Sequence, residues 1–294
     1  MASSKHRKNR LVPVVHAEGF PSVVGIGGTP AAEMEGKVDM VFIDPPYNIG
    51  VDYGGADDSK SDEDYKRFTL SYLETCHCML RPGGSLFLLL NPRWAAFAGG
   101  HLHDAAKRWT FVNEIIWHYR FGMYNDRSFI GTHANLLYFV KVPYEQRTWR
   151  VRPVLEPSLR KSLYGDKRVS ESPRKGERPL GDVWFGEHLS RVQGGNRERR
   201  TTEQGALADH PNQVPEILVA RCIRSTTAPG DLVVDLFTGS GTTGTVAHAL
   251  GRRFAGWEIN PKFAKSALDR ILKGPARDVG GSLVAATKGY AEAT

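Results

Sequence analysis

The stretch Leu232-Val-Val-Asp-Leu-Phe-Thr-Gly-Ser-Gly-Thr-Thr-Gly244 decides the fold. Its first six residues are apolar except for one aspartate, which is typical of a strand buried in a parallel sheet. Three glycines follow in the spacing G-x-G-x-x-G, and a helix is expected to run from this turn to Leu250. A strand, a glycine-rich turn and a helix in this order predict a doubly wound α/β sheet that binds a ligand beyond the strand's carboxyl end.

The glycine spacing matches the dinucleotide fingerprint, and Glu258 follows the first glycine by 19 positions, so the motif taken alone supports NAD. The fingerprint normally opens a six-strand domain, whereas only 50 of the 294 residues follow Gly244. The remaining strands must therefore come from upstream, in a permuted order. A nucleoside without phosphates suits this loop, because glycines let the backbone approach a ribose or an amino acid closely. Glu258 can accept both ribose hydroxyls, and Asp235 can accept from an amine.

Outward from this stretch, apolar runs alternate with segments of helical spacing, which predicts a mostly parallel sheet with helices between its strands. Arg81-Pro-Gly-Gly84 is expected to form a turn. The strands at 111–119 and 136–142 are expected at an antiparallel edge. Further strands are predicted at 38–43, 85–90 and 253–257, and helices at 64–80, 94–108, 211–224 and 261–272.

The middle of the chain differs from both flanks. Apolar periodicity fades there, and proline, glycine, serine and arginine accumulate, so we expect a separate lobe or a long mobile insertion. Residues 145–204 carry 14 Lys and Arg against 9 Asp and Glu, which is most of the net charge of +7. The predicted segments are a basic arm (1–20), the first half of an α/β domain (21–144), the irregular insertion (145–207), the second half of that domain (208–274) and a tail (275–294).

Composition narrows the class of protein. Hydrophobic residues make up 40% and charged residues 24%, which excludes a disordered chain, collagen or a coiled coil. The longest apolar candidate, 85–90, is too short to span a bilayer, and the basic N-terminus lacks the apolar stretch of a secretory signal. Three cysteines cannot build a disulfide framework, which indicates a reducing compartment. A pI near 9.3 makes nucleic acid a reasonable partner.

Asp44-Pro45-Pro46-Tyr47 directly follows the apolar run at 38–43, and its two prolines end that strand. This tetrapeptide suits methyl transfer to an exocyclic amine, whose hydrogens must be held by two acceptors before its lone pair can react. Asp44 offers a carboxylate, Pro45 offers a carbonyl without a competing N–H, and Tyr47 can stack on the base. An ordinary strand-ending turn is the alternative reading of such a tetrapeptide.

Together the two segments resemble the DNA amino-methyltransferases that depend on S-adenosylmethionine, in the order typical of the β subgroup. The resemblance covers about 38–142 and 208–272, and 210–215 resembles the family's His-Pro-Thr-Gln-Lys-Pro segment with Val214 in place of Lys. It implies a class I methyltransferase sheet in which 145–207 recognises the target. It also implies Asp44, Pro45, Pro46 and Tyr47 as catalytic residues. The residues that it implies for cofactor binding are Asp235, Phe237, Thr238, Gly239, Gly241, Thr242, Glu258, Asn260, His210 and Gln213.

The resemblance implies methylation of the N6 amine of an adenine flipped out of duplex DNA, with N4 of cytosine as the alternative. A homodimer, a partner restriction endonuclease and a location in bacterial or phage-infected cytoplasm are further expectations from the family. Nine basic residues of the insertion are predicted to contact DNA: Arg160, Lys161, Lys167, Arg168, Arg174, Lys175, Arg197, Arg199 and Arg200.

Several other functions stay open or are set aside. An RNA or protein amide methyltransferase more often resembles Asn-Pro-Pro-Tyr, so Asp44 counts against it. A catalytically inactive DNA-binding relative would be expected to lack some of the catalytic residues, and all of them are present. Methylation at cytosine C5 is rejected, because no cysteine lies in a Pro-Cys loop. Cys76-His77-Cys78 is not expected to bind a metal, since adjacent ligands on one helix cannot face one ion.

Overall fold

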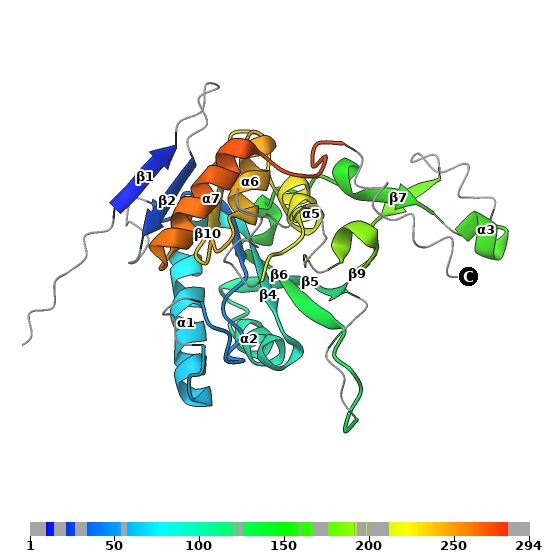
Figure 1. Cartoon of the computed structure of the whole chain (residues 1–294). Coiled ribbons are helices and arrows are strands. Elements are labelled where there is room, and N and C mark those ends of the chain that lie inside the picture. The colour runs from blue at the N-terminus through cyan, green and yellow to red at the C-terminus, as the bar shows by residue number, and fades with distance from the viewer. Residues whose placement is uncertain are drawn as a thin grey trace, which may run out of the picture.

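A computed structural model shows a nine-stranded sheet with the order β1-β2-β11-β10-β3-β4-β6-β5-β9 (Figure 1). It describes residues 10–14, 22–26, 34–53, 58–119, 122, 126–158, 160–166, 176–190, 192, 198 and 212–281. The strands of this sheet are β1 (Arg10–Val14), β2 (Ser22–Ile26), β3 (Val38–Ile43), β4 (Leu80–Leu90), β5 (Trp109–His118), β6 (His133–Lys141), β9 (Val183–Trp184), β10 (Leu232–Asp235) and β11 (Arg253–Glu258).

The centre of the sheet is parallel and one side is antiparallel, as expected from the sequence. Strands β2, β11, β10, β3 and β4 run in one direction. Strand β6 runs against both β4 and β5, which confirms the predicted antiparallel strands. The strand that carries the glycine loop, β10, lies next to β3 although about 190 residues separate them in the chain. This pairing confirms the doubly wound sheet in permuted order.

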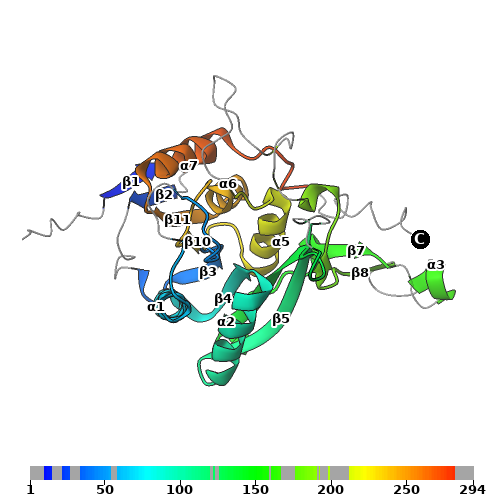
Figure 2. The same cartoon turned by 60° about the horizontal axis from the view of Figure 1, so that its bottom comes forward.

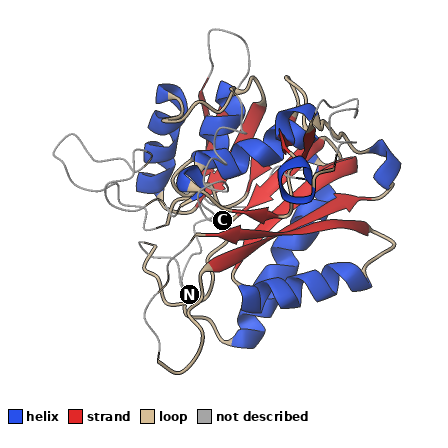
Figure 3. Ribbon diagram, turned by 90° about the vertical axis from the view of Figure 1, so that its right-hand side faces the viewer, coloured by secondary structure: helices blue, strands red, loops and turns tan. Residues whose placement is uncertain are grey.

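Helices cover both faces of the sheet (Figures 2 and 3). Helices α1 (Asp62–Met79) and α2 (Pro92–Asp104) pack on one face, around Tyr65, Tyr72 and Trp94. Helices α5 (Glu216–Thr226), α6 (Thr242–Ala249) and α7 (Pro261–Lys273) pack on the other. Both faces of β3 are therefore buried, which explains why its sequence is an almost continuous apolar run.

Several predicted boundaries differ from the structure, and helix α2 ends at Asp104, four residues before the predicted end at 108. Residues 81–84 are predicted as a turn but belong to β4. They fit into the strand because its pairing with β3 shifts register between Val38 and Met40, and because Gly83 adopts a left-handed conformation (φ +73°). Helix α5 begins at Glu216 and not at 211, because Pro215 adopts extended backbone at its start. Strand β1 lies within the segment predicted as an arm. Its Pro13 is tolerated because β1 is an edge strand.

The insertion is only partly separate from the domain. Strands β7 (Leu155–Pro157) and β8 (Glu177–Pro179) form their own small sheet. Helix α3 (Arg160–Tyr164) lies between them in the chain, and short helical turns lie before β7 and after β8. Strand β9, in contrast, pairs with β5 and extends the main sheet. Trp184 and Leu189 are buried in the main core, so this described part of the insertion packs against the main sheet.

Candidate cofactor and target-base site

The Asp44 loop and the glycine loop leave the same edge of the sheet. Strands β3 and β10 are parallel neighbours, and Met40 and Val41 pair with Val233 and Val234. Each strand therefore delivers its following loop to the carboxyl edge, where ligands bind in open α/β sheets. The sequence prediction that these two loops converge is supported by the strand order.

Asp44 and Tyr47 contact each other directly. The Tyr47 hydroxyl donates a hydrogen bond of 2.6 Å to Oδ1 of Asp44. Burial, followed by the negative charge of Asp44, raises the pKa of Tyr47 well above its usual value, so the phenol stays protonated. Asp44 and Tyr47 are both partly buried, and Pro45 between them is buried.

Two side chains from the covering helices fix the backbone of this loop. The Tyr65 hydroxyl on α1 donates to the carbonyl of Pro46 (2.5 Å), and Nε1 of Trp94 on α2 donates to the carbonyl of Tyr47 (2.9 Å). The two rings also pack on each other, with centroids 4.3 Å apart. Both carbonyls that follow Pro45 thus have protein partners, which leaves the Pro45 carbonyl as the candidate second acceptor for a substrate amine.

The chain after Tyr47 is held by two polar side chains. Asn48 adopts a left-handed conformation (φ +56°), which asparagine tolerates better than most residues. Asp58 accepts hydrogen bonds from the backbone N–H groups of Asn48, Ile49 and Val51 at 2.8, 3.2 and 2.9 Å. The Asn48 side chain in turn bridges to the backbone of Lys60. Sequence reasoning missed Asp58, because its partners lie seven to ten residues earlier.

The glycine loop is arranged around Glu258 at the end of β11. Gly239 and Gly241 have φ of +48° and +79°, and Gly241 lies at the N-terminus of α6. The Gly239 N–H donates to one Glu258 oxygen and the Asn260 N–H to the other, both at 2.9 Å. Burial raises the pKa of Glu258. Its carboxylate is thus oriented by the protein and keeps acceptor capacity for two hydroxyls.

Asp235 shapes the loop from within. Thr243 Oγ1 donates to one carboxylate oxygen (2.7 Å), and the Phe237 N–H donates to the other (2.9 Å). Burial raises the pKa of Asp235 to about 7, and the nearby charge of Asp44 adds to the rise. Both carboxylate oxygens therefore already accept a hydrogen bond from the protein. A hydrogen bond from a cofactor amine to Asp235 would have to form in addition to these two.

Three other predicted cofactor residues make separate contacts around this loop. The Phe237 ring packs edge-on against Phe68 and Tyr72 of α1, at 5.7 and 5.5 Å. The Thr238 N–H bonds the carbonyl of Trp257, which fastens the loop to β11. Asn260 caps α7, and its side-chain amide reaches the carbonyl of Tyr53 (3.3 Å).

A buried ion pair lies behind the glycine loop and was not predicted. Glu216 on α5 and Arg270 on α7 are 2.8 Å apart and almost completely buried. Arg270 also donates to Thr242 Oγ1 (2.7 Å) and to the carbonyl of Ser240 (3.2 Å). Because residues 54 positions apart form this pair, neither local pattern nor spacing indicates it.

The segment predicted to hold the methionine end of a cofactor is partly described. Gln213 donates to the carbonyl of Glu198 (3.0 Å), and Val214 is buried in the core. The Glu198 carboxylate accepts from the Glu216 N–H and pairs with Arg277. Gln213 is thus attached to the same buried network as Arg270, whereas His210 lies outside the described residues.

Of the predicted DNA contacts, the structure places one side chain. Arg160 is exposed on α3, 3.7 Å from Asp166. Lys161 lies on the same helix, but its side chain is outside the described part. The remaining predicted residues outside the described ranges are Lys167, Arg168, Arg174, Lys175, Arg197, Arg199 and Arg200.

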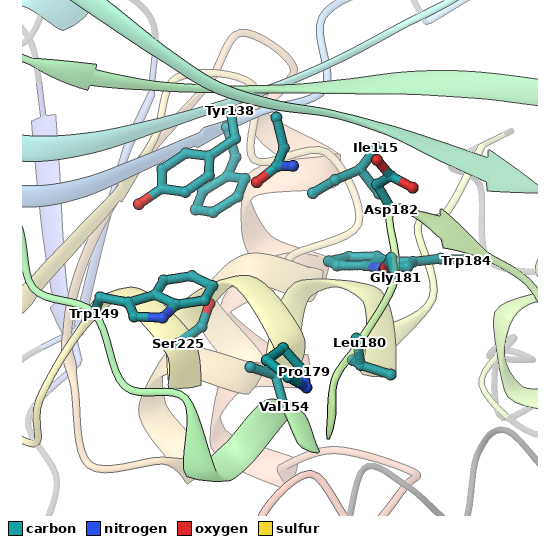
Figure 4. Close-up of a pocket in the computed structure, with 12 residues that line it drawn as sticks. Ile115, Tyr138, Trp149, Val154, Pro179, Leu180, Gly181, Asp182, Trp184 and Ser225 are labelled. Carbon is teal, nitrogen blue, oxygen red and sulfur yellow. The ribbon is translucent and has the colours of Figure 1, made fainter. Parts of the chain in front are cut away.

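Two other features lie apart from this site. A pocket of about 220 Å³ is lined by Tyr138, Trp149 and Trp184 between the sheet, α5 and the insertion (Figure 4), and none of the predicted site residues lines it. On α1, Cys76 is buried while Cys78 is exposed, so the two thiols point to different surroundings. Among the helices of the described ranges, none is long and apolar enough to cross a bilayer.

Comparison with known families supports the interpretation of the Asp44 loop and the glycine loop. Residues 38–269 match the N6/N4 methyltransferase family model, described as DNA methylase. The chain belongs to this family. Membership confirms the predicted resemblance to DNA amino-methyltransferases and supports S-adenosylmethionine as the cofactor. The β subgroup, which the family model does not specify, stays a prediction.

Several curated relatives are named as methyltransferases. The type II methyltransferase M.HpaI of Haemophilus parainfluenzae is 30% identical over 237 residues, 81% of this chain and 69% of the relative. The type II methyltransferase M1.MboII of Moraxella bovis is 31% identical over 80% of this chain and 90% of its own length. The DNA adenine methyltransferase YhdJ of Escherichia coli K12 is 29% identical over 80% of this chain and 76% of its own length.

Two solved structures show the same fold. The complex of M1.HpyAVI with SAM superposes with a TM-score of 0.53 over 80% of this chain and 89% of that one, at 20% identity. The cytosine-N4-specific PvuII DNA methyltransferase superposes with a TM-score of 0.58 over 92% of both chains, at 17% identity. These likenesses confirm the predicted class I methyltransferase fold.

Proposed function

We propose that this protein transfers a methyl group from S-adenosylmethionine to the N6 amine of an adenine flipped out of duplex DNA. The observation that carries the proposal is the adjacency of β3 and β10. It brings the Asp44 loop, which suits an amine acceptor, to the edge that also presents the glycine loop and Glu258.

The residues around the glycine loop fit a nucleoside cofactor. Glu258 is oriented by two backbone N–H groups and can accept the two ribose hydroxyls. The left-handed Gly239 allows the backbone to pass close to the ligand. When bound, S-adenosylmethionine supplies an electrophilic methyl group on a sulfonium. The negative charge of Asp44 would favour that positive charge electrostatically.

On the substrate side, Asp44 and the Pro45 carbonyl accept the two N6 hydrogens and direct the nitrogen lone pair out of the ring plane. The Tyr47 ring stacks on the base, a contact worth roughly 1–3 kcal/mol. Its hydroxyl gives up the bond to Asp44 when the amine arrives. Such a transfer would need no covalent enzyme intermediate, so positioning and charge placement would supply the rate. The methylated amine would lose one proton toward the acceptors that hold its hydrogens, with the Asp44 carboxylate as the basic one.

Adenine is favoured over cytosine by the first residue of the tetrapeptide, Asp44. The relative YhdJ is named as an adenine methyltransferase, which supports this choice. The basic insertion residues, beginning with Arg160, are proposed to contact DNA. A homodimer, a partner endonuclease and a cytoplasmic location stay predictions from the family.

The test is transfer of labelled methyl from S-adenosylmethionine to unmethylated mixed-sequence duplex DNA, followed by nucleoside analysis. Wild type is expected to make N6-methyladenine. Asp44→Asn keeps the side-chain shape but removes the negative charge and one acceptor, so we expect a loss of at least 100-fold in rate, in the range of lost electrostatic stabilisation. Cofactor affinity, measured by calorimetry, should change little.

Asp62→Asn provides the matched control, since Asp62 is an exposed carboxylate on α1 paired with Arg93. It should methylate at the wild-type rate. N4-methylcytosine in the product would keep the mechanism and correct the base. Cofactor binding without DNA methylation by wild type would overturn the proposal.

A further inference from the structure

The described part of the connection between β5 and β6, residues 119, 122 and 126–132, is called the hairpin here and extends past the ends of these two strands (Figure 1). Leu90, the last residue of β4, pairs with Asn135, and His118 pairs with His133. Strands β3 and β4 are parallel, so the described residues between His118 and His133 lie beyond the carboxyl edge. This hairpin is therefore on the side from which a DNA base must enter.

The base of the hairpin is closely held. The Tyr119 N–H donates to the carbonyl of Thr132 (2.9 Å), and the Tyr119 hydroxyl donates to the carbonyl of His133 (3.0 Å). A Cβ atom added at Gly122 would lie 2.2 Å from the carbonyl oxygen of Gly131 and 2.8 Å from Ile130 Cγ2. The two sides are thus in contact at Gly122, and glycine there permits the close approach.

The residues just beyond this contact present apolar side chains to solvent. Phe129 has a relative exposure of 103%, the largest among the exposed large hydrophobic side chains of the described ranges, and Ile130 has 43%. Arg127, two positions before Phe129, is also exposed and brings positive charge to this side. Exposed aromatic surface beside a basic residue fits a partner that is both stacked and anionic, as DNA is.

We propose that Phe129 is a wedge that enters the base stack of the duplex at the position left by the flipped base. The inference rests on the proposed DNA substrate. Strand β4 alone separates β3 from β6, so the two are roughly 10 Å apart, and three residues from Thr132 to Phe129 reach roughly 10 Å beyond the sheet. Phe129 is then on the order of 15 Å from the Asp44 loop.

This separation suits the geometry of base flipping. The target nucleotide rotates about its backbone into the pocket, so the gap that it leaves lies in the stack and not in the pocket. An apolar side chain that fills the gap replaces the lost stacking, as apolar wedges do where proteins kink DNA. Phe129 is a positioning residue in this account, because it acts on the duplex and does not touch the reacting amine.

The experiment uses two duplexes that contain the recognition site, located first by mapping the positions that wild type methylates. In one duplex the target base is paired, and in the other it lies opposite an abasic site, where flipping is easier. For Phe129→Ala we expect a 10- to 100-fold loss in kcat/KM on the paired duplex and less than a threefold loss on the abasic one. Phe129→Leu should retain most activity on both duplexes.

Leu272→Ala is the matched control, because Leu272 is an exposed apolar residue on the last turn of α7, at the opposite edge of the sheet. It should behave as wild type on both duplexes. With 2-aminopurine as the target base, fluorescence on binding should rise for wild type and clearly less for Phe129→Ala.

Equal losses on the paired and abasic duplexes would overturn the wedge and assign Phe129 a structural role. No loss on either duplex would overturn it as well. In both cases methylation by wild type in the same assay leaves the proposed function standing, so the two failures are distinguishable.

Discussion

At the residue scale, the bond between Tyr47 and Asp44 has two effects. It holds the ring beside the carboxylate in the free protein, and it occupies one of the oxygens that a substrate amine requires. The base must therefore displace a hydroxyl before it is held. If Asp44 were exposed to water, the base would have to displace water from the carboxylate at the same step. The Tyr47 hydroxyl already takes the place of part of that water in the free protein, so less desolvation is needed when the base arrives.

The buried carboxyl of Asp235 predicts a pH effect on stability. Its folded-state pKa is about 7, whereas an unfolded aspartate titrates near 3.9. The native state thus binds more protons between pH 4 and 7, and stability must fall as pH rises through this window. Each pKa unit corresponds to about 1.4 kcal/mol, so the fall is worth a few kcal/mol.

Asp235→Asn removes this titration, and we expect a flatter curve of unfolding free energy against pH, measured by urea denaturation. Thr243→Val removes a hydrogen bond that lowers the pKa, so the fall should extend to higher pH and become larger in total. Parallel curves for wild type and Asp235→Asn would contradict the assigned titration.

At the element scale, the turn before α6 is packed against α7. A Cβ atom at Gly241 would lie 2.8 Å from Ala267 Cα and 3.0 Å from its carbonyl oxygen, in addition to the strain of φ +79°. Gly251 has a similar φ of +70°, but the nearest atom to a Cβ added there would be Pro229 Cβ, 4.0 Å away. Backbone strain would therefore arise from a side chain at either position, whereas steric overlap would arise only at Gly241, so substitutions at the two glycines distinguish these costs.

We expect Gly251→Ala to lower the free energy of unfolding by about 1–2 kcal/mol, the cost of a left-handed residue. Gly241→Ala should cost at least about 1–3 kcal/mol more, because the helix backbone must shift. Urea denaturation at one pH measures both. Equal losses would show that α7 yields to the added methyl group at no cost.

The sequence predicts those elements whose pattern is local. Residues 38–43 coincide with β3, since burial on both faces leaves a continuous apolar run, and Pro261 marks the first turn of α7. Strand β9 is not predicted, because a strand of two residues is too short to show an alternating apolar pattern. Glu216 and Arg270 were missed because each reads as an ordinary helix residue, and only the tertiary fold brings them together.

At the scale of the whole molecule, the positive charge is concentrated in the insertion. If the insertion contacts phosphates, log Kd for DNA should depend linearly on log salt concentration, with a slope of about 0.9 for each contact. Arg160→Ala should reduce this slope by about one. Arg253→Ala, at the amino-terminal end of β11 and so away from the carboxyl edge of the sheet, should leave it unchanged, and fluorescence anisotropy across a salt series measures both.

The permuted strand order also governs how the chain is made. Leu232 N–H bonds Asp39 Oδ2 across 193 residues, and β3 pairs with β10 on one side. During synthesis the apolar β3 leaves the ribosome about 190 residues before its neighbour β10 and stays unpaired on that side until β10 has been made. Its open edge is a template for wrong pairing throughout that interval. Translation pauses between these segments should therefore promote aggregation of the nascent protein, and chaperone capture should protect it.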